Sequence, residues 1–355
     1  MHYRELGDSG VEVSEVAFGA WVVGTDWWGD RSDADAVEMV EYALENDVTF
    51  FDTGDVYGHG RSEELVGEAL SEHRDEVTVG TKVGYDFYDN PQAGHGELPK
   101  ELTPEYVREA VENSLDRLDM EYVDVLFLHN ANVDEVTDEL LETLYDLRGE
   151  GVVDALGWAL GPSIGWLAEG DRAAELDFDA IQTVYNLFEQ TPGNHFVESI
   201  REENADTSIV ARVPHSSGLL NEQVTPDTEL GEGDHRAYRP DDWFETGWEK
   251  LDEIRFLERD GARTMSQAAI QWLLAHDEVA AVTPTFRSRE DIDEWAAASE
   301  TPPLSEEEFE RVADLSARNF GIDRSDGMDA EEFRTSVGGE DLRDAGVIPA
   351  NSAEN

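Results

Sequence analysis

The stretch VTFFDTGDVYGHGRSEELVGEAL, residues 48–70, decides the fold. It opens with an apolar run that ends in an aspartate and passes through a glycine-rich turn. It then continues with leucine, valine and alanine at the spacing of an amphipathic helix. Together these features predict one unit in which a buried strand is followed by a helix.

The same unit recurs on both sides of this stretch. Strands are expected at eight apolar runs, residues 15–19, 48–53, 77–83, 122–130, 153–160, 180–186, 208–214 and 279–285. Seven connections between them contain apolar residues at helical spacing. Alternating strands and helices indicate an α/β protein with a parallel sheet, and eight repeats predict a closed (β/α)8 TIM barrel. An open, doubly wound sheet is the alternative.

Segments outside this rhythm set the expected domain organisation. YREL and VEV flank the turn sequence GDSG, which predicts an N-terminal β-hairpin. Residues 215–247 are rich in Gly, Asp, His and Trp, and we expect them to form a long loop over the C-terminal face of the barrel. We therefore expect a single catalytic domain at 1–317 and an acidic, partly mobile extension at 318–355.

The charge balance is extreme. The chain has 83 acidic and 25 basic residues, a net charge of −58, and its only lysines are Lys82, Lys100 and Lys250. Such acidity disfavours nucleic acids and anionic membranes as partners. Because 39% of the residues are hydrophobic, we expect a folded protein adapted to molar salt, where charges are screened within roughly 3 Å.

Several classes of protein are disfavoured by what the sequence lacks. It has no cysteine, and so no disulfide framework. No apolar run approaches the length of a membrane span, and the first residues do not resemble a signal peptide, so a cytoplasmic location is expected. No metal-binding motif is visible, and the oligomeric state is not predicted.

Four residues at the carboxyl ends of expected strands, or in the loops just after them, form a chemical set, because a barrel gathers such positions at one face. Lys82 lies in an apolar run and needs a counter-charge, which Asp52 can supply. An ammonium close to Tyr57 would make its hydroxyl a better proton donor. His129 would hydrogen-bond the oxygen on which negative charge develops.

The segment FDTGDVYGHGRSEELVGEAL resembles the signature of the aldo-keto reductase family. VGTKVG and VDVLFLHN are similar to the segments that carry the family's lysine and histidine, and YRELGDSGVEVSEVAFGAW to its N-terminal hairpin and first strand. The resemblance covers about residues 3–317. It implies NADP- or NAD-dependent reduction of aldehydes or ketones, with Asp52, Tyr57, Lys82 and His129 as the catalytic tetrad.

The resemblance also implies cofactor contacts. Gln182 matches the residue that holds the nicotinamide amide, and Arg212 lies where many members stack a tyrosine on the ring. A loop over the pyrophosphate would contain Ser217, Gly218 and Leu220. The family's Ser-Asn pair at the end of the fifth strand is replaced by Ala159 and Leu160.

The segment VTPTFRSREDIDEW, which would bind the adenosine half of the cofactor, departs most from the family pattern. Arg287 and Arg289 are the cations that could pair with a 2′-phosphate, whereas Asp291 would repel it. On balance NADP(H) is expected rather than NAD(H).

The substrate pocket should be lined by loops that follow the strands. The candidate wall residues are Trp21, Trp27, Trp28, Tyr85, Phe87, Tyr88, Asn130 and Trp158. Aromatic walls suit aromatic, extended apolar or sugar carbonyls, and the sequence does not choose among them.

Two alternatives remain open at this stage. Some members of the family are cofactor-sensing regulatory subunits that bind a membrane-protein partner, and such a subunit could retain the tetrad. A barrel lyase or isomerase would be active without a nicotinamide.

Overall fold

The computed structural model describes residues 1–25, 31–88, 98–161, 166–176, 178–231, 234, 236 and 243–322. Its main sheet has eight parallel strands in the order β10-β9-β8-β7-β6-β5-β4-β3. They are β3 (Phe18–Gly19), β4 (Phe50–Asp52), β5 (Thr78–Val83), β6 (Val123–His129), β7 (Val153–Ala159), β8 (Ala180–Val184), β9 (Ser208–Arg212) and β10 (Val279–Thr283). Each expected strand is therefore confirmed, within a few residues at its ends.

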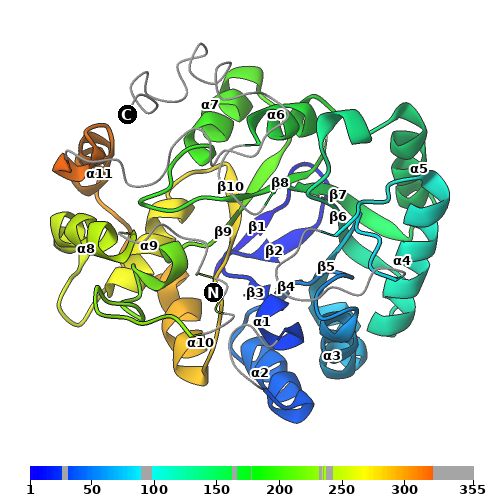
Figure 1. Ribbon diagram of the computed structural model, residues 1–355, viewed down its shortest axis with the longest axis horizontal. Coiled ribbons are helices and arrows are strands. Elements are labelled where there is room, and N and C mark those ends of the chain that lie inside the picture. Colours follow the sequence, from blue (N-terminus) through cyan, green and yellow to red (C-terminus); the bar gives the residue numbers. More distant parts are fainter. Residues whose placement is uncertain are drawn as a thin grey trace.

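The two edges of the sheet meet beside β3. Val16 forms a parallel bridge with Val282. The Ala17 N–H donates to the Val282 oxygen at 2.9 Å, and the Val282 N–H donates to the Glu15 oxygen at 2.8 Å. This contact closes the barrel (Figure 1) and excludes the open-sheet alternative.

The expected hairpin is also present, as β1 (Tyr3–Glu5) and β2 (Glu12–Ser14). The Thr78 hydroxyl, at the start of β5, donates to the Glu12 oxygen at 2.7 Å. Leu6 and Val13 are fully buried with the residues that fill the barrel, such as Phe127. The hairpin thus covers the amino-terminal end of the strands and leaves the opposite end for a site.

Helices surround the sheet in Figure 1. They are α1 (Trp21–Gly24), α2 (Asp33–Glu45), α3 (Arg61–Leu70), α4 (Pro104–Leu118), α5 (Asp138–Gly149), α6 (Leu167–Glu175), α7 (Gly193–Glu203), α8 (Trp243–Ile254), α9 (Met265–Leu274), α10 (Arg289–Ala296) and α11 (Glu306–Ser316). Short 3-10 helices lie at Ser71–Glu76, Val133–Glu135, Ser216–Gly218, Arg255–Leu257, Ala297–Glu300 and Asn319–Gly321.

Local sequence explains where several helices begin. Thr264 and Gln267 form a reciprocal capping box at the start of α9, and Ser305 and Glu308 do so at α11. The Ser288 side chain caps α10. Among the residues that the structure describes, no helix is long and apolar enough to cross a membrane. The expected boundary at residue 317 stays a prediction, because residues 323–355 lie outside the described part.

Candidate active site

Lys82 on β5 is fully buried, and Asp52 at the end of β4 is its counter-charge. Lys82 Nζ lies 2.7 Å from Asp52 Oδ1 and donates to the backbone oxygen of Thr53 at 2.5 Å. Burial lowers the pKa of Lys82, but the charge of Asp52 and the interaction with Tyr57 outweigh it and raise the pKa overall. The ammonium therefore stays charged inside the barrel. The ion pair expected from the sequence is present.

The loop of residues 54–60 brings Tyr57 to this pair. Lys82 Nζ lies 4.8 Å from the centre of the Tyr57 ring. The Asp55 N–H donates to the Lys82 oxygen at 3.2 Å, so the loop is attached to β5 by its backbone. Gly58 has a φ of 62°, and a Cβ atom there would lie 2.0 Å from the Gly24 oxygen. Only glycine fits this position, which fixes the path of the Tyr57 loop.

His129 ends β6 on the other side of Tyr57. The rings of Tyr57 and His129 meet edge to face, with centroids 5.6 Å apart. Burial, followed by the charges of Lys82, Arg212 and Lys100, lowers the pKa of His129 well below its usual value. The imidazole is therefore neutral near pH 7, and one of its nitrogens carries a hydrogen that can be donated.

Three of the expected wall residues surround this group. Trp21 lies beside Tyr57, with ring centroids 6.4 Å apart, and Tyr85 packs edge to face on His129 at 5.0 Å. Asn130 Nδ2 donates to the Tyr85 hydroxyl at 2.7 Å. The buried atoms His129 Nδ1 and Asn130 Oδ1 have no hydrogen-bond partner among the residues that the structure describes. Neighbouring buried polar atoms without partners are typical of a binding site.

Trp158 is not a wall of this site, contrary to the sequence prediction. It is fully buried, packs on Phe178 with centroids 5.8 Å apart, and donates from Nε1 to the Ala131 oxygen at 3.0 Å. Side chains alternate along β7, so Ala155 and Ala159 point into the barrel and Trp158 points toward the helices.

Four other aromatic residues were expected to line the substrate pocket. Phe87 is buried and stacks on Tyr88 with centroids 4.1 Å apart, close to His59 behind the Tyr57 loop. Trp27 and Trp28 lie outside the described residues.

The expected nicotinamide contacts lie at the ends of β8 and β9. Gln182 is buried, and within the described part of the chain its Nε2 atom has no hydrogen-bond partner. Arg212 donates from Nη2 to the backbone oxygens of Leu160 and Gly161, at the end of β7. A buried amide donor without a partner, at the same barrel face as Tyr57 and His129, fits the carboxamide of a nicotinamide.

The expected pyrophosphate loop follows β9. Ser217 and Gly218 adopt left-handed φ values of 57° and 99°, and Leu220 is fully buried. A Cβ atom at Gly218 would lie 3.5 Å from Nη1 of Arg236. The Arg236 guanidinium therefore lies beside this loop, where its Nε and Nη2 atoms donate to Asp234 at 2.8 and 2.6 Å.

The residues expected to contact the adenosine half of the cofactor have different surroundings. Arg289 forms an ion pair with Glu38 on α2 and lies over Tyr42, with its Cζ atom 4.6 Å from the ring centre. Arg287 is half-buried, and Arg31 Nη2 donates to its backbone oxygen at 2.8 Å. Asp291 accepts the Arg287 N–H at 2.8 Å, so this carboxylate is directed to the backbone.

Sequence reasoning missed five residues that the fold brings to this region. They are Arg31 and Arg236 near the cofactor loops, and Asp55, Glu63 and Arg117 behind Tyr57. Asp55 and Glu63 belong to the segment that resembles the family signature. The available signal was that neither of these acids had been assigned a role. Arg31, Arg117 and Arg236 come from other segments and give no signal without the fold.

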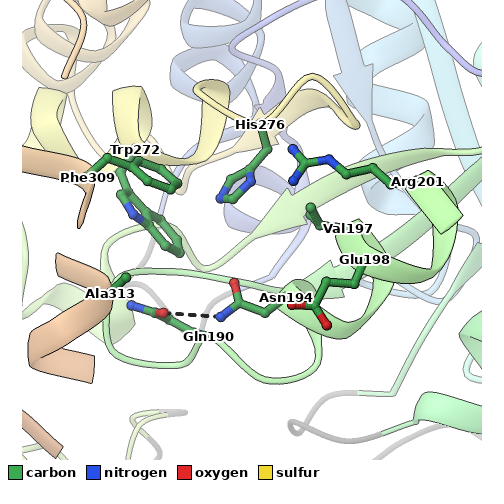
Figure 2. A pocket seen from close by; sticks show the side chains of 9 residues that line it. All are labelled: Gln190, Asn194, Val197, Glu198, Arg201, Trp272, His276, Phe309 and Ala313. Carbon is green, nitrogen blue, oxygen red and sulfur yellow. Dashed lines mark hydrogen bonds between the residues drawn. The ribbon is translucent and has the colours of Figure 1, made fainter. Parts of the chain in front are cut away.

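A separate cavity of about 190 Å³ lies on the outer side of the barrel, among α7, α9 and α11. Figure 2 shows Trp272, Phe309 and His276 along one side of it, and Gln190 hydrogen-bonded to Asn194 along the other. None of the expected catalytic, cofactor or substrate residues lines this cavity.

Comparison with known proteins identifies the family. A profile described as "Aldo/keto reductase family" matches residues 15–317. The chain belongs to the aldo/keto reductase family. It is an NAD(P)-dependent oxidoreductase that acts on carbonyl compounds and the corresponding alcohols, as the resemblance implied.

Among solved structures, the chain is similar to the aldo-keto reductase AKR11C1 from Bacillus halodurans in its holo form. The identity is 28%, the TM-score is 0.74, and the match covers 89% of this chain and 96% of that one. It is also similar to the glycerol dehydrogenase AKR11B4 from Gluconobacter oxydans, with 27% identity, a TM-score of 0.75, and 91% and 97% coverage.

Curated relatives include both enzymes and a channel subunit. The uncharacterised oxidoreductase YqkF of Bacillus subtilis is 28% identical, over 88% of this chain and 95% of its own length. A probable voltage-gated potassium channel subunit beta of Arabidopsis thaliana is also 28% identical, over 86% and 93%.

Proposed function

We propose that Tyr57 is the proton donor of an NADP(H)-preferring carbonyl reductase, with Lys82, Asp52 and His129 supporting it. The single observation that carries this proposal is the buried Lys82 ammonium, 2.7 Å from Asp52 and 4.8 Å from the centre of the Tyr57 ring. A positive charge there stabilises the phenolate that remains after the hydroxyl has given up its proton.

Each residue has a distinct part in the proposed reaction. A bound reduced nicotinamide supplies the hydride. The Tyr57 hydroxyl donates its proton to the carbonyl oxygen, and neutral His129 donates a hydrogen bond to the same oxygen as negative charge develops. Asp52 keeps the ammonium of Lys82 charged and in place. In the oxidation of an alcohol, the Tyr57 phenolate takes the proton back.

Support for NADP(H) comes from the arginines near the pyrophosphate loop. Arg31 contacts the Arg287 backbone, and the charge of Arg236 acts on Arg287. The carboxylate of Asp291, which would repel a 2′-phosphate, accepts the Arg287 N–H and is held against the backbone at that point. Guanidinium groups bind phosphate through paired, charge-assisted hydrogen bonds.

We further place the enzyme in the cytoplasm of a cell that accumulates salt, because a net charge of −58 suits molar salt. The experiment is a screen of aldehydes and ketones in molar KCl, including methylglyoxal and the oxidation of glycerol. Nicotinamide absorbance is followed separately with NADPH and NADH.

Tyr57→Phe tests the assignment of the proton donor. It should lower turnover by about 100-fold or more, because general acid catalysis is lost, while nucleotide binding measured by tryptophan fluorescence changes little. Turnover equal to that of the wild type would contradict the role of Tyr57.

A regulatory role is the second candidate, favoured by the similarity to the Arabidopsis channel subunit. It predicts very slow turnover with every carbonyl and a nucleotide that stays bound through purification. Rapid, repeated turnover with release of the oxidised nucleotide would contradict it.

A further inference from the structure

Asp55 is a buried acid that the proposed reaction does not use. It stands in the Tyr57 loop, and its side chain is fully buried. Among the described residues its carboxyl oxygens have no hydrogen bond of normal geometry, and only the Val56 N–H interacts with them from the backbone. The Asp55 N–H donates to the backbone oxygen of Lys82 at 3.2 Å. An ionised carboxylate in such a place would lose its hydration and gain only partial compensation, so the site favours the protonated form.

The nearby cation is already occupied by another acid. Arg117 on α4 donates from Nε to Glu63 Oε2 at 2.7 Å, and the fully buried Glu63 also accepts the Thr81 hydroxyl. Arg117 further contacts the Ser114 and Tyr88 hydroxyls at 3.2 and 3.3 Å. Asp55 therefore lies near a second carboxylate and forms no ion pair with any residue that the structure describes.

The charges around Asp55 also favour its protonated form. Burial, followed by the negative charge of Glu63, raises the pKa of Asp55 well above its usual value, and Arg117 and Lys82 offset these effects only in part. Tyr88 and Tyr106 are also within electrostatic range. The surroundings of Asp55 therefore favour the uncharged form of its carboxyl.

An uncharged acid has a specific advantage at this position. A second carboxylate would offset the positive charge of Lys82 and weaken its effect on Tyr57. A protonated carboxyl fills the same volume and adds no charge.

We propose that Asp55 is a positioning residue that works as a neutral acid: its fully buried carboxyl fills space beneath the Tyr57 loop, which the Asp55 N–H attaches to β5, without adding a negative charge beside Lys82. The inference rests on the proposed function of Tyr57 for its effect on turnover. The protonation state of Asp55 does not depend on that function.

The test compares Asp55→Asn, Asp55→Ala and the control Asp116→Asn, which changes an exposed acid next to Arg117. Asparagine copies the shape and the neutrality of the protonated acid, whereas alanine removes the support. We expect Asp55→Ala to lower kcat by more than about tenfold, with KM for the nucleotide little changed, because a small displacement of Tyr57 is costly. Asp55→Asn should recover most of this loss.

Infrared spectroscopy at pH 7 provides a readout that is independent of activity. The wild type should show the C=O stretch of a protonated carboxylic acid, which is absent in Asp55→Asn and retained in Asp116→Asn. Absence of this band in the wild type would overturn the inference, as would an Asp55→Asn variant as slow as Asp55→Ala. Should Asp55→Ala fail to fold, the band and the Asp55→Asn turnover still decide. A wild type that reduces no carbonyl would instead contradict the proposed function.

Discussion

Lys82 Nζ and Asp52 Oδ1 lie 2.7 Å apart, with the lysine side chain at 0% and the aspartate at 7% exposure. Because both side chains are buried, water cannot solvate either charge when its partner is removed. Asp52→Asn should therefore destabilise the protein by about 3 kcal/mol, because an unpaired buried charge remains. Turnover should fall with it, since the ammonium next to Tyr57 would lose its proton more easily.

Denaturant unfolding and kcat, both measured in molar KCl, check this prediction. Asp33→Asn is the matched control, because Asp33 pairs with Arg61 at 2.6 Å in an exposed position. It should cost no more than about 1 kcal/mol. Equal losses in the two variants would argue against the buried pair.

Arg287 and Arg289 should differ in how much each contributes to NADPH binding. Arg287→Met should weaken NADPH binding by about tenfold or more and leave NADH binding little changed, because only NADPH carries the 2′-phosphate. Arg289→Met should have a much smaller effect, since Arg289 pairs with Glu38 on α2. Fluorescence titration with both nucleotides measures the four affinities. Equal weakening of NADPH and NADH by Arg287→Met would rule out contact with the phosphate.

Two buried histidines predict how stability depends on pH. Burial lowers the pKa of His215 to about 4, against the opposing hydrogen bond with the Ser266 oxygen, and burial followed by the charge of Arg201 lowers that of His276 to about 4. In this pH range the unfolded chain binds protons that the folded chain does not. Stability should therefore fall as the pH drops from about 6.5 toward 4, by up to about 1.4 kcal/mol per histidine and pH unit.

His215→Gln isolates this contribution. Subtracting its unfolding free energy from that of the wild type, in molar KCl between pH 5 and 7, removes the effect of the many surface carboxylates. The difference should shrink as the pH falls. A difference that does not depend on pH would show that His215 is not held neutral.

The sequence was sufficient for the architecture because the signal is local: each strand is an apolar run and each helix an amphipathic one. It also identified Lys82, because a lysine within an apolar run requires a partner. Trp158 was misplaced because successive side chains of a strand point alternately into the barrel and toward the helices. Only the pairing of β7 with its neighbours fixes which side chains point inward, and Ala159 is one of them. Arg236 lies beside Gly218, and no local sequence pattern predicts that contact.

Low salt should unfold the protein. With 83 acids and 25 bases, the folded surface holds like charges close together, and molar salt reduces their repulsion by shortening the screening length to roughly 3 Å. At 0.01 M salt that length is about 30 Å, and the repulsion acts across the whole molecule. The melting temperature should fall steadily as KCl is lowered from molar to millimolar. An unchanged melting temperature would refute adaptation to salt.

Gly58 supplies the sharpest test of the Tyr57 loop. Gly58→Ala places a Cβ atom 2.0 Å from the Gly24 oxygen, at a φ of 62°. Gly10→Ala is its matched control, because Gly10 has a φ of 76° and no atom within 4 Å of the added Cβ. The control should cost only the left-handed conformation, about 1–2 kcal/mol, with kcat preserved. Gly58→Ala must also move the loop, so kcat should fall by about tenfold or more. Equal kcat values in the two variants would show that the path of this loop does not govern turnover.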